Sequence, residues 1–179
     1  MPGLYAVLEL SLGGFFALAY LSLSFSFALL TFLLAAGVLT FIVAYDLRHT
    51  IVPPYASLAL LVLSIATLLL RGFTPYELGG TLMTAGLIAI GFLLLHVLSA
   101  GKAMGLGDTP VALALSLLTA PYAFSGLLFS FWIGALCGIV ILFARRGGPR
   151  MGIEVPFVPF LALGYLIAFF IQWNPLAFL

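Results

Sequence analysis

The sequence carries very little charge. Its 179 residues include only 6 Lys or Arg and 5 Asp or Glu, which is 6% of the chain, whereas soluble domains contain about 25% charged residues. Hydrophobic residues make up 65% of the chain, and the mean hydropathy is +1.34. These values exclude a soluble globular protein and indicate a polytopic membrane protein. A net charge of +1 also leaves no basic surface for nucleic acid, so no nucleic-acid partner is expected.

Cysteine is almost absent as well. The single cysteine, Cys137, lies in an apolar run, so the chain has neither a disulfide nor a paired-cysteine metal site. No phosphate-binding loop of the P-loop or dinucleotide type occurs. We therefore expect no cofactor and no metal. No Lys or Arg precedes Arg48, so the first apolar segment lacks the basic start of a signal peptide and is expected to be retained.

Long apolar runs fill the chain, and a transmembrane helix needs about 20 such residues. A cluster of three serines, at positions 22, 24 and 26, divides the first 42-residue run (Leu4 to Tyr45) into two spans. We predict an all-α bundle of seven transmembrane spans in one domain, residues 1–179, and six spans if the short fifth one does not cross. The spans are expected near residues 4–21, 27–45, 55–70, 79–99, 110–120, 123–144 and 155–173.

The basic residues test the number of spans. With seven spans, only Arg71 lies on one side of the membrane, and all the other basic residues lie on the opposite side, which the positive-inside rule makes cytoplasmic. If the fifth span did not cross, the last basic cluster would leave that side, so we predict that it crosses. The basic residues expected in the cytoplasm are Arg48, Lys102, Arg145, Arg146 and Arg150.

Only two aspartates occur, Asp46 and Asp108, and each lies where an apolar run meets a polar segment on the cytoplasmic side. A carboxylate within hydrocarbon costs roughly 2.5–3.5 kcal/mol, so both are candidate functional residues. Two carboxylates in a poorly solvated site cannot easily both ionise, and such a pair shares a proton. One member can then activate a water molecule as a base while the other donates a proton as an acid. A helix N-terminus would favour ionised Asp108 as the base and protonated Asp46 as the acid, unless Arg48 and His49 reverse this order.

A glycine-rich segment, residues 101–107, precedes Asp108. We expect Gly105 and Gly107 to allow a sharp turn and the close approach of a substrate backbone. Pro110 suits the first turn of a helix, with Asp108 or Thr109 as its cap. Lys102 in this segment, and Glu154 beside the last basic cluster, are candidate substrate-binding residues.

Three motifs together resemble a known family. Gly105-Leu106-Gly107-Asp108 looks like the GxGD motif of membrane aspartyl proteases, and the segment from Asp46 to Pro53 looks like the other aspartate motif of type IV prepilin peptidases. The segment from Val155 to Gly164, VPFVPFLALG, is similar to that family's IPFGPFLALG sequence. The resemblance implies an aspartic endopeptidase with Asp46 and Asp108 as its catalytic pair. Such an enzyme cleaves the short basic leader from type IV pilin-like precursors at the cytoplasmic face of the inner membrane.

The sequence departs from the family pattern at three places. Thr109-Pro110 follow the GxGD motif where the family usually has Val-Lys, which makes Lys102 a candidate substitute for the lysine. Val158 stands where the family has glycine. The cytoplasmic region with paired cysteines that longer family members carry is not found, so N-methyltransferase activity is not expected. The resemblance is therefore to the catalytic membrane domain alone, or to the short archaeal preflagellin-type peptidases.

Other functions compete with this interpretation. Tyr45-Asp46 and the GLGD motif are also similar to signal peptide peptidases, although their Pro-Ala-Leu motif is missing here. A small proton- or cation-coupled transporter would use the same carboxylates, but it would need them near the membrane midplane. A scaffold without chemistry would leave the paired motifs unexplained. Glu9, Glu77 and His96 are interpreted as a helix contact, a solvated loop charge and a helix-packing residue.

Overall fold

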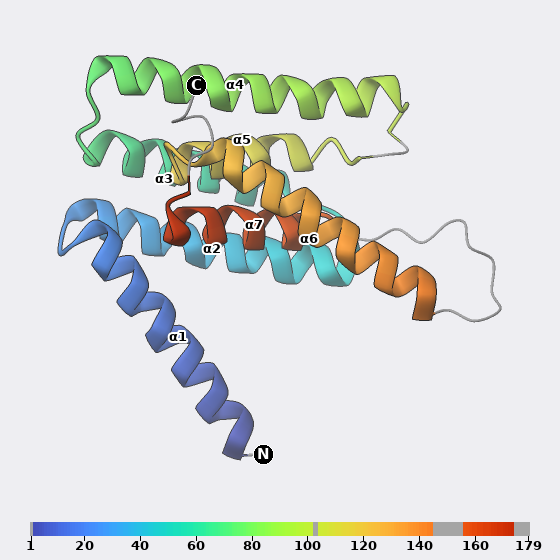
Figure 1. Cartoon of the computed structure of the whole chain (residues 1–179), viewed down its shortest axis with the longest axis horizontal. Helices are drawn as coiled ribbons and strands as arrows, with labels where there is room; N and C mark the ends of the chain where they lie inside the picture. The colour runs from blue at the N-terminus through green and yellow to red at the C-terminus, as the bar shows by residue number, and fades with distance from the viewer. Residues whose placement is uncertain (1, 102–103, 145–155, 174–179) are drawn as a thin grey trace.

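The computed structural model describes residues 2–101, 104–144 and 156–173, and for residues 2–11, 141–142 and 144 only the backbone is considered. Within these ranges the chain forms seven α-helices and no strand, which confirms the prediction of an all-α bundle (Figure 1). The helices are α1 (Pro2–Leu23), α2 (Phe27–His49), α3 (Pro54–Leu70), α4 (Pro75–Leu98), α5 (Asp108–Leu118), α6 (Ala123–Ala144) and α7 (Val158–Ile171).

Local polar residues set the helix boundaries. The chain breaks between α1 and α2 at the predicted serines, because Ser24 has a φ of 55° and Ser26 caps α2 by accepting a hydrogen bond from the Leu29 N–H. Helix α4 begins earlier than predicted, at Pro75. Thr74 and Glu77 form a capping box there, in which the Glu77 carboxylate accepts from the Thr74 N–H at 2.8 Å. Glu77 is exposed, as predicted, but it lies in the first turn of α4 and not in a loop.

The helices pack in layers around α5. Figure 1 shows α4 above α3 and α5, with α2 and α7 beneath them. Eight of the 11 residues of α5 are buried, which makes this short helix the centre of the core. Helix α6 packs most extensively against α7. Helix α1 leans away from the bundle and contacts it near its C-terminal end, where Phe15 stacks on Phe32 (Figure 1).

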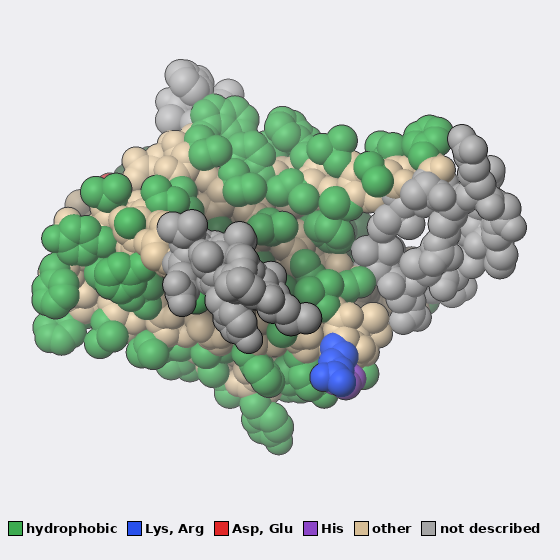
Figure 2. All heavy atoms as spheres, turned by 90° about the horizontal axis from the view of Figure 1, so that it is seen from below, with side chains coloured by type: hydrophobic (Ala, Val, Ile, Leu, Met, Phe, Trp, Pro, Cys, Tyr) green, Lys and Arg blue, Asp and Glu red, His purple; other side chains and the backbone are tan. Residues whose placement is uncertain are grey.

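The outer surface of the bundle is apolar. Large hydrophobic side chains are exposed on every helix whose side chains are described except α5, and Figure 2 shows a face dominated by them with one small basic patch beside a histidine. Three helices are long and apolar enough to cross a membrane: Phe27–His49, Pro75–Leu98 and the Ala123–Val140 part of α6. In water this surface would aggregate, whereas lipid tails solvate it. The prediction of a helical membrane bundle is confirmed.

Helix α5 connects the two ends of the bundle despite its length. Its 11 residues rise about 16 Å, against about 30 Å of hydrocarbon. At one end Gly107 lies against Val52, and at the other end the Arg71 guanidinium donates a hydrogen bond to the Ala120 carbonyl. Figure 1 shows consecutive helices from α2 to α7 running in alternate directions. The crossing of the membrane by the short fifth segment stays a prediction.

Candidate active site

Asp46 lies one turn before the end of α2 and is only 4% exposed. Its Oδ2 accepts a hydrogen bond from the backbone N–H of Val158, 3.3 Å away, at the first residue of α7. The first N–H groups of a helix have no partner within that helix, so the start of α7 supplies a donor and a favourable dipole to the carboxylate. A buried carboxylate is thus held by backbone from the far end of the chain.

Asp108 is the first residue of α5 and is 7% exposed. Burial beside a second carboxylate disfavours the charged form of a carboxyl group. The fold brings the two carboxylates to the same end of the bundle, because Gly107 contacts Val52 in the segment that follows Asp46. This is the arrangement in which a carboxyl pair shares a proton.

The two aspartate motifs also touch through Gly107 and Val52. A Cβ atom at Gly107 would lie 2.8 Å from the Val52 Cβ, closer than real Cβ contacts allow. Val52 belongs to the segment between α2 and α3 that follows Asp46. Because Val158 reaches Asp46 from the third motif, all three motifs meet at one end of the bundle.

The family model for the type IV leader peptidases matches residues 33–143, which is more than half of the chain and includes both aspartates. The chain belongs to the type IV leader peptidase family. No curated protein and no solved structure matches it. The leader peptidase assignment makes the chain a peptidase of the membrane. The third motif, residues 155–164, lies beyond the matched residues, so its place beside Asp46 is known from the structure alone.

The glycines of this leader peptidase are not needed for the predicted sharp turn, and the predicted approach of a substrate backbone stays a prediction. Gly107 has a φ of −65°, which any residue adopts, so it is required for close approach to Val52 and not for a turn. The sharp turn after α4 occurs earlier, at Ala100 and Gly101, which have φ values of 51° and 76°. A Cβ at Gly105 would lie 3.5 Å from the Asp108 Oδ2, an ordinary contact that leaves room beside the carboxylate.

The start of α5 agrees only in part with the sequence analysis. Pro110 lies in the first turn, as expected. The cap position is occupied by Gly107, so the prediction that Asp108 or Thr109 caps the helix was wrong. Residues 105–109 already form a turn, in which the Asp108 N–H donates to the Gly105 carbonyl at 3.2 Å. Asp108 therefore enters the helix as its first residue.

Several predicted or contributing residues remain to be placed. Lys102, Glu154 and the basic residues Arg145, Arg146 and Arg150 lie outside the described residues. Sequence reasoning missed the Val158 N–H as the partner of Asp46, since it treated Val158 as a departure from the family motif. The following Pro159 was an available indication, because proline is common in the first turn of a helix, where N–H groups are free.

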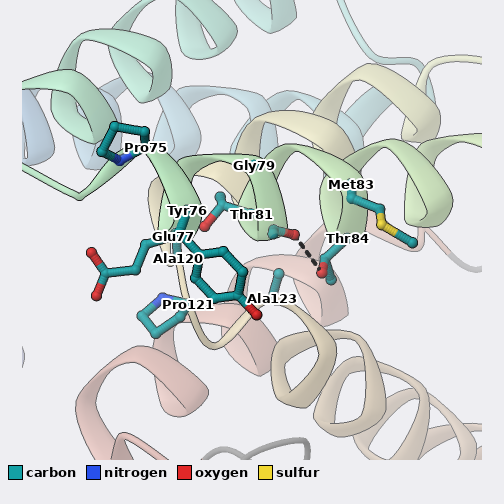
Figure 3. A pocket seen from close by; sticks show the side chains of 11 residues that line it. Pro75, Tyr76, Glu77, Gly79, Thr81, Met83, Thr84, Ala120, Pro121 and Ala123 are labelled. Atoms are coloured by element: carbon teal, nitrogen blue, oxygen red, sulfur yellow. Dashed lines mark hydrogen bonds between the residues drawn. The ribbon is translucent and has the colours of Figure 1, made fainter.

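A cavity of about 620 Å³ lies away from the carboxylates, between the first turns of α4 and the segment Ala120–Ala123 (Figure 3). Tyr76, Thr81 and Pro121 are among its lining residues, and neither aspartate is. This is the end at which α3 finishes and α4 begins. The cavity therefore does not belong to the candidate active site.

Proposed function

We propose that the chain is a membrane aspartic endopeptidase that cleaves the basic leader of type IV prepilin-like precursors at the cytoplasmic face of the inner membrane. Residues 1–179 form one membrane-embedded peptidase domain in this proposal, and the catalytic pair is Asp46 and Asp108. The observation that carries it is the convergence of three separate segments on two buried carboxylates. Family membership supports the peptide substrate.

The proposed roles of the two aspartates reverse the expectation from the sequence. Both carboxylates are buried, but Asp46 accepts the N–H of Val158 at the start of α7, and such a hydrogen bond favours the ionised form. The charge of an ionised Asp46 in turn favours the neutral form of Asp108. Asp46 is accordingly the base and Asp108 the acid of the resting pair.

The reaction follows from these protonation states. Asp46 takes a proton from a water molecule, whose oxygen bonds to the carbonyl carbon of the scissile peptide, while Asp108 gives its proton to the carbonyl oxygen. The tetrahedral intermediate then breaks its C–N bond, and the proton held by Asp46 passes to the leaving amine. The proton on the carbonyl oxygen returns to Asp108 as the new carboxyl group forms. Both aspartates end in their starting states, so no metal and no covalent intermediate are required.

The position of the pair fits a substrate that lies half in water and half in lipid. Asp46 is close to the end of α2, next to Arg48 and His49, which are exposed. A basic leader would stay in the aqueous phase at this end, and the apolar helix that follows it would lie in the bilayer. Lys102 and Glu154 remain proposed substrate contacts.

The deciding experiment is cleavage of a synthetic type IV prepilin-type precursor by the purified protein in lipid nanodiscs, followed by mass spectrometry. We expect Asp46→Asn and Asp108→Asn to lower the rate by at least about 10³-fold, in the range lost when a member of a catalytic pair is removed. Glu77→Gln is the matched control, because it neutralises a carboxylate at the opposite end of the bundle. The new N-terminus should remain unmethylated when a methyl donor is present.

Three other outcomes would change the assignment. Retained cleavage in both asparagine variants would remove the pair from the mechanism. Cleavage of unrelated transmembrane peptides within their apolar segment, and not of the precursor, would favour a protease of the signal-peptide-peptidase kind. Proton or cation flux through proteoliposomes that stops in both variants, without any cleavage, would favour a transporter.

A further inference from the structure

His96 lies in the last turn of α4, close to the segment that leads to Asp108. Its Nδ1 atom is 2.9 Å from the carbonyl oxygen of Met104. A carbonyl oxygen can only accept a hydrogen bond, so the proton of this bond must be on Nδ1 and His96 is the donor. The side chain therefore ties the end of α4 to the chain just before Gly105.

The backbone around His96 is shaped to allow this bond. The chain reverses through Ala100 and Gly101, both at positive φ, and the Gly101 N–H donates to the His96 carbonyl at 2.9 Å. A Cβ atom at Gly101 would lie 3.3 Å from the Cε1 atom of the His96 ring. Glycine at this position thus serves both the left-handed backbone and the space that the imidazole needs.

The hydrogen bond from His96 to Met104 affects Asp108, because Met104 lies just before the turn that leads to it. The residues that follow it form the turn in which the Asp108 N–H donates to the Gly105 carbonyl, and Gly107 then contacts Val52. His96 thus connects α4 to residues 104–107, and Val52 connects the same residues to the Asp46 motif. These two contacts together set the direction of the chain that leads into Asp108.

We infer that His96 is a positioning residue, which fixes residues 104–107 through its Nδ1–H bond to Met104 and so orients Asp108 toward Asp46. This inference rests on the proposed aspartic peptidase function. The inference goes beyond the proposed function because it gives a role to a histidine that belongs to none of the three motifs. His96 touches neither substrate nor the reacting atoms, so its effect should appear in kcat.

Three substitutions at His96 distinguish the effect of losing the hydrogen bond from the effect of losing the volume of the ring. In His96→Asn the side-chain amide nitrogen stands at the place of Nδ1 and keeps the donor. In His96→Gln the donor moves outward to the place of Nε2, and His96→Ala removes it. Misplacing a catalytic group by about 1 Å can cost 10²-fold. We expect His96→Gln and His96→Ala to lower kcat at least tenfold with KM within about twofold, and His96→Asn to stay within about threefold of wild type.

A second measurement is independent of catalysis. The chain has only two histidines, so nitrogen NMR of ¹⁵N-histidine-labelled protein is simple to assign, with His96→Asn identifying the resonances. The hydrogen bond requires a proton on Nδ1 of His96. Finding the Nε2–H tautomer would overturn the inference.

The kinetic and NMR measurements together distinguish a failure of this inference from a failure of the proposed function. If wild type cleaves the precursor and all three variants match it, or if His96→Asn loses as much as His96→Ala, His96 does not position the segment. If wild type cleaves no precursor, the proposed substrate is wrong, and the tautomer still decides whether the bond to Met104 exists. Thermal unfolding of each variant shows whether a loss of kcat occurs in a folded protein.

Discussion

At the scale of single residues, Asp46 and Asp108 are held by backbone groups and not by basic side chains. No ion pair involves either aspartate within the described residues. Val158 supplies an N–H to Asp46, and Asp108 is buried at the same end of the bundle. Burial without a cationic partner disfavours the charged form of a carboxyl group, and a pair of such groups titrates as a unit. The pH dependence of activity should therefore reveal the pair.

The first prediction concerns this titration. The pair needs one shared proton, and raising the pH removes that proton together with the acid function. We expect kcat/KM to fall roughly tenfold per pH unit on the alkaline side of its optimum, measured with the precursor peptide in nanodiscs. A profile without such an alkaline fall would contradict the assignment of a protonated aspartate as the acid.

Gly107 provides the second prediction. Gly107→Ala would bring a Cβ to 2.8 Å from the Val52 Cβ, so the segment carrying Asp108 must shift. We expect kcat to fall about 10- to 100-fold, since a small displacement of a catalytic group has an effect of this size. Gly86→Ala in α4 is the control, because no atom lies within 4 Å of the added methyl group. Equal activity of the two variants would show that the contact with Val52 does not position Asp108.

At the scale of elements, the contact between α6 and α7 is the closest helix pairing described. Gly126 faces the ring of Tyr165, and Gly164 lies directly against the backbone and hydroxyl of Ser130. Small residues at such positions let two helix backbones approach, which is the main source of packing energy between helices in lipid. Helix α7 also begins at Val158, so this pairing fixes the donor to Asp46.

The third prediction tests that pairing. Gly164→Ala should destabilise the protein by about 2–3 kcal/mol, because the methyl group would overlap Ser130 backbone that cannot move aside. Gly138→Ala in α6 is the matched control, since its methyl group would meet no atom within 4 Å. Thermal unfolding in detergent, followed by circular dichroism, measures the difference. Equal melting temperatures would refute the close approach of α6 and α7 at Gly164.

At the scale of the whole molecule, the ends of the bundle differ in chemistry. The end of α2, which carries Asp46 and Arg48, and the start of α5, which carries Asp108, lie at one end of the bundle, while the end of α3 and the start of α4 lie at the other (Figure 1). The cavity and the capping box belong to this second end. Arg71, which follows α3, contacts the Ala120 carbonyl and the rings of Phe73 and Phe169, so its charge serves the fold.

The fourth prediction is the orientation in the membrane. In a Cys137→Ser background, Ile51→Cys and Tyr76→Cys place exposed thiols at opposite ends. A membrane-impermeant maleimide should label position 51 only in inverted vesicles and position 76 only in right-side-out vesicles. Labelling of both positions from the same side would contradict the seven-span alternation, and the reverse pattern would place the aspartates outside.

The sequence by itself determined the number of helices, most of their boundaries and the two candidate aspartates. Backbone groups in lipid must be satisfied within each helix, so long apolar runs between polar breaks define the spans almost locally. The capping box at Thr74 and the early start of α4 show the limit, because Glu77 reads as a loop charge until its hydrogen bonds are seen.

Only the tertiary structure decided how the site is assembled. The donor to Asp46 comes from Val158, which is 112 residues away, and no local pattern specifies such a pairing. Gly107 packs against Val52, and His96 holds Met104, through contacts that exist only after the helices have docked. Helix formation depends on neighbouring residues in the sequence. The placement of Asp108 near Asp46 depends on the packing of α2, α5 and α7, and the apolar periodicity of each helix does not specify that packing.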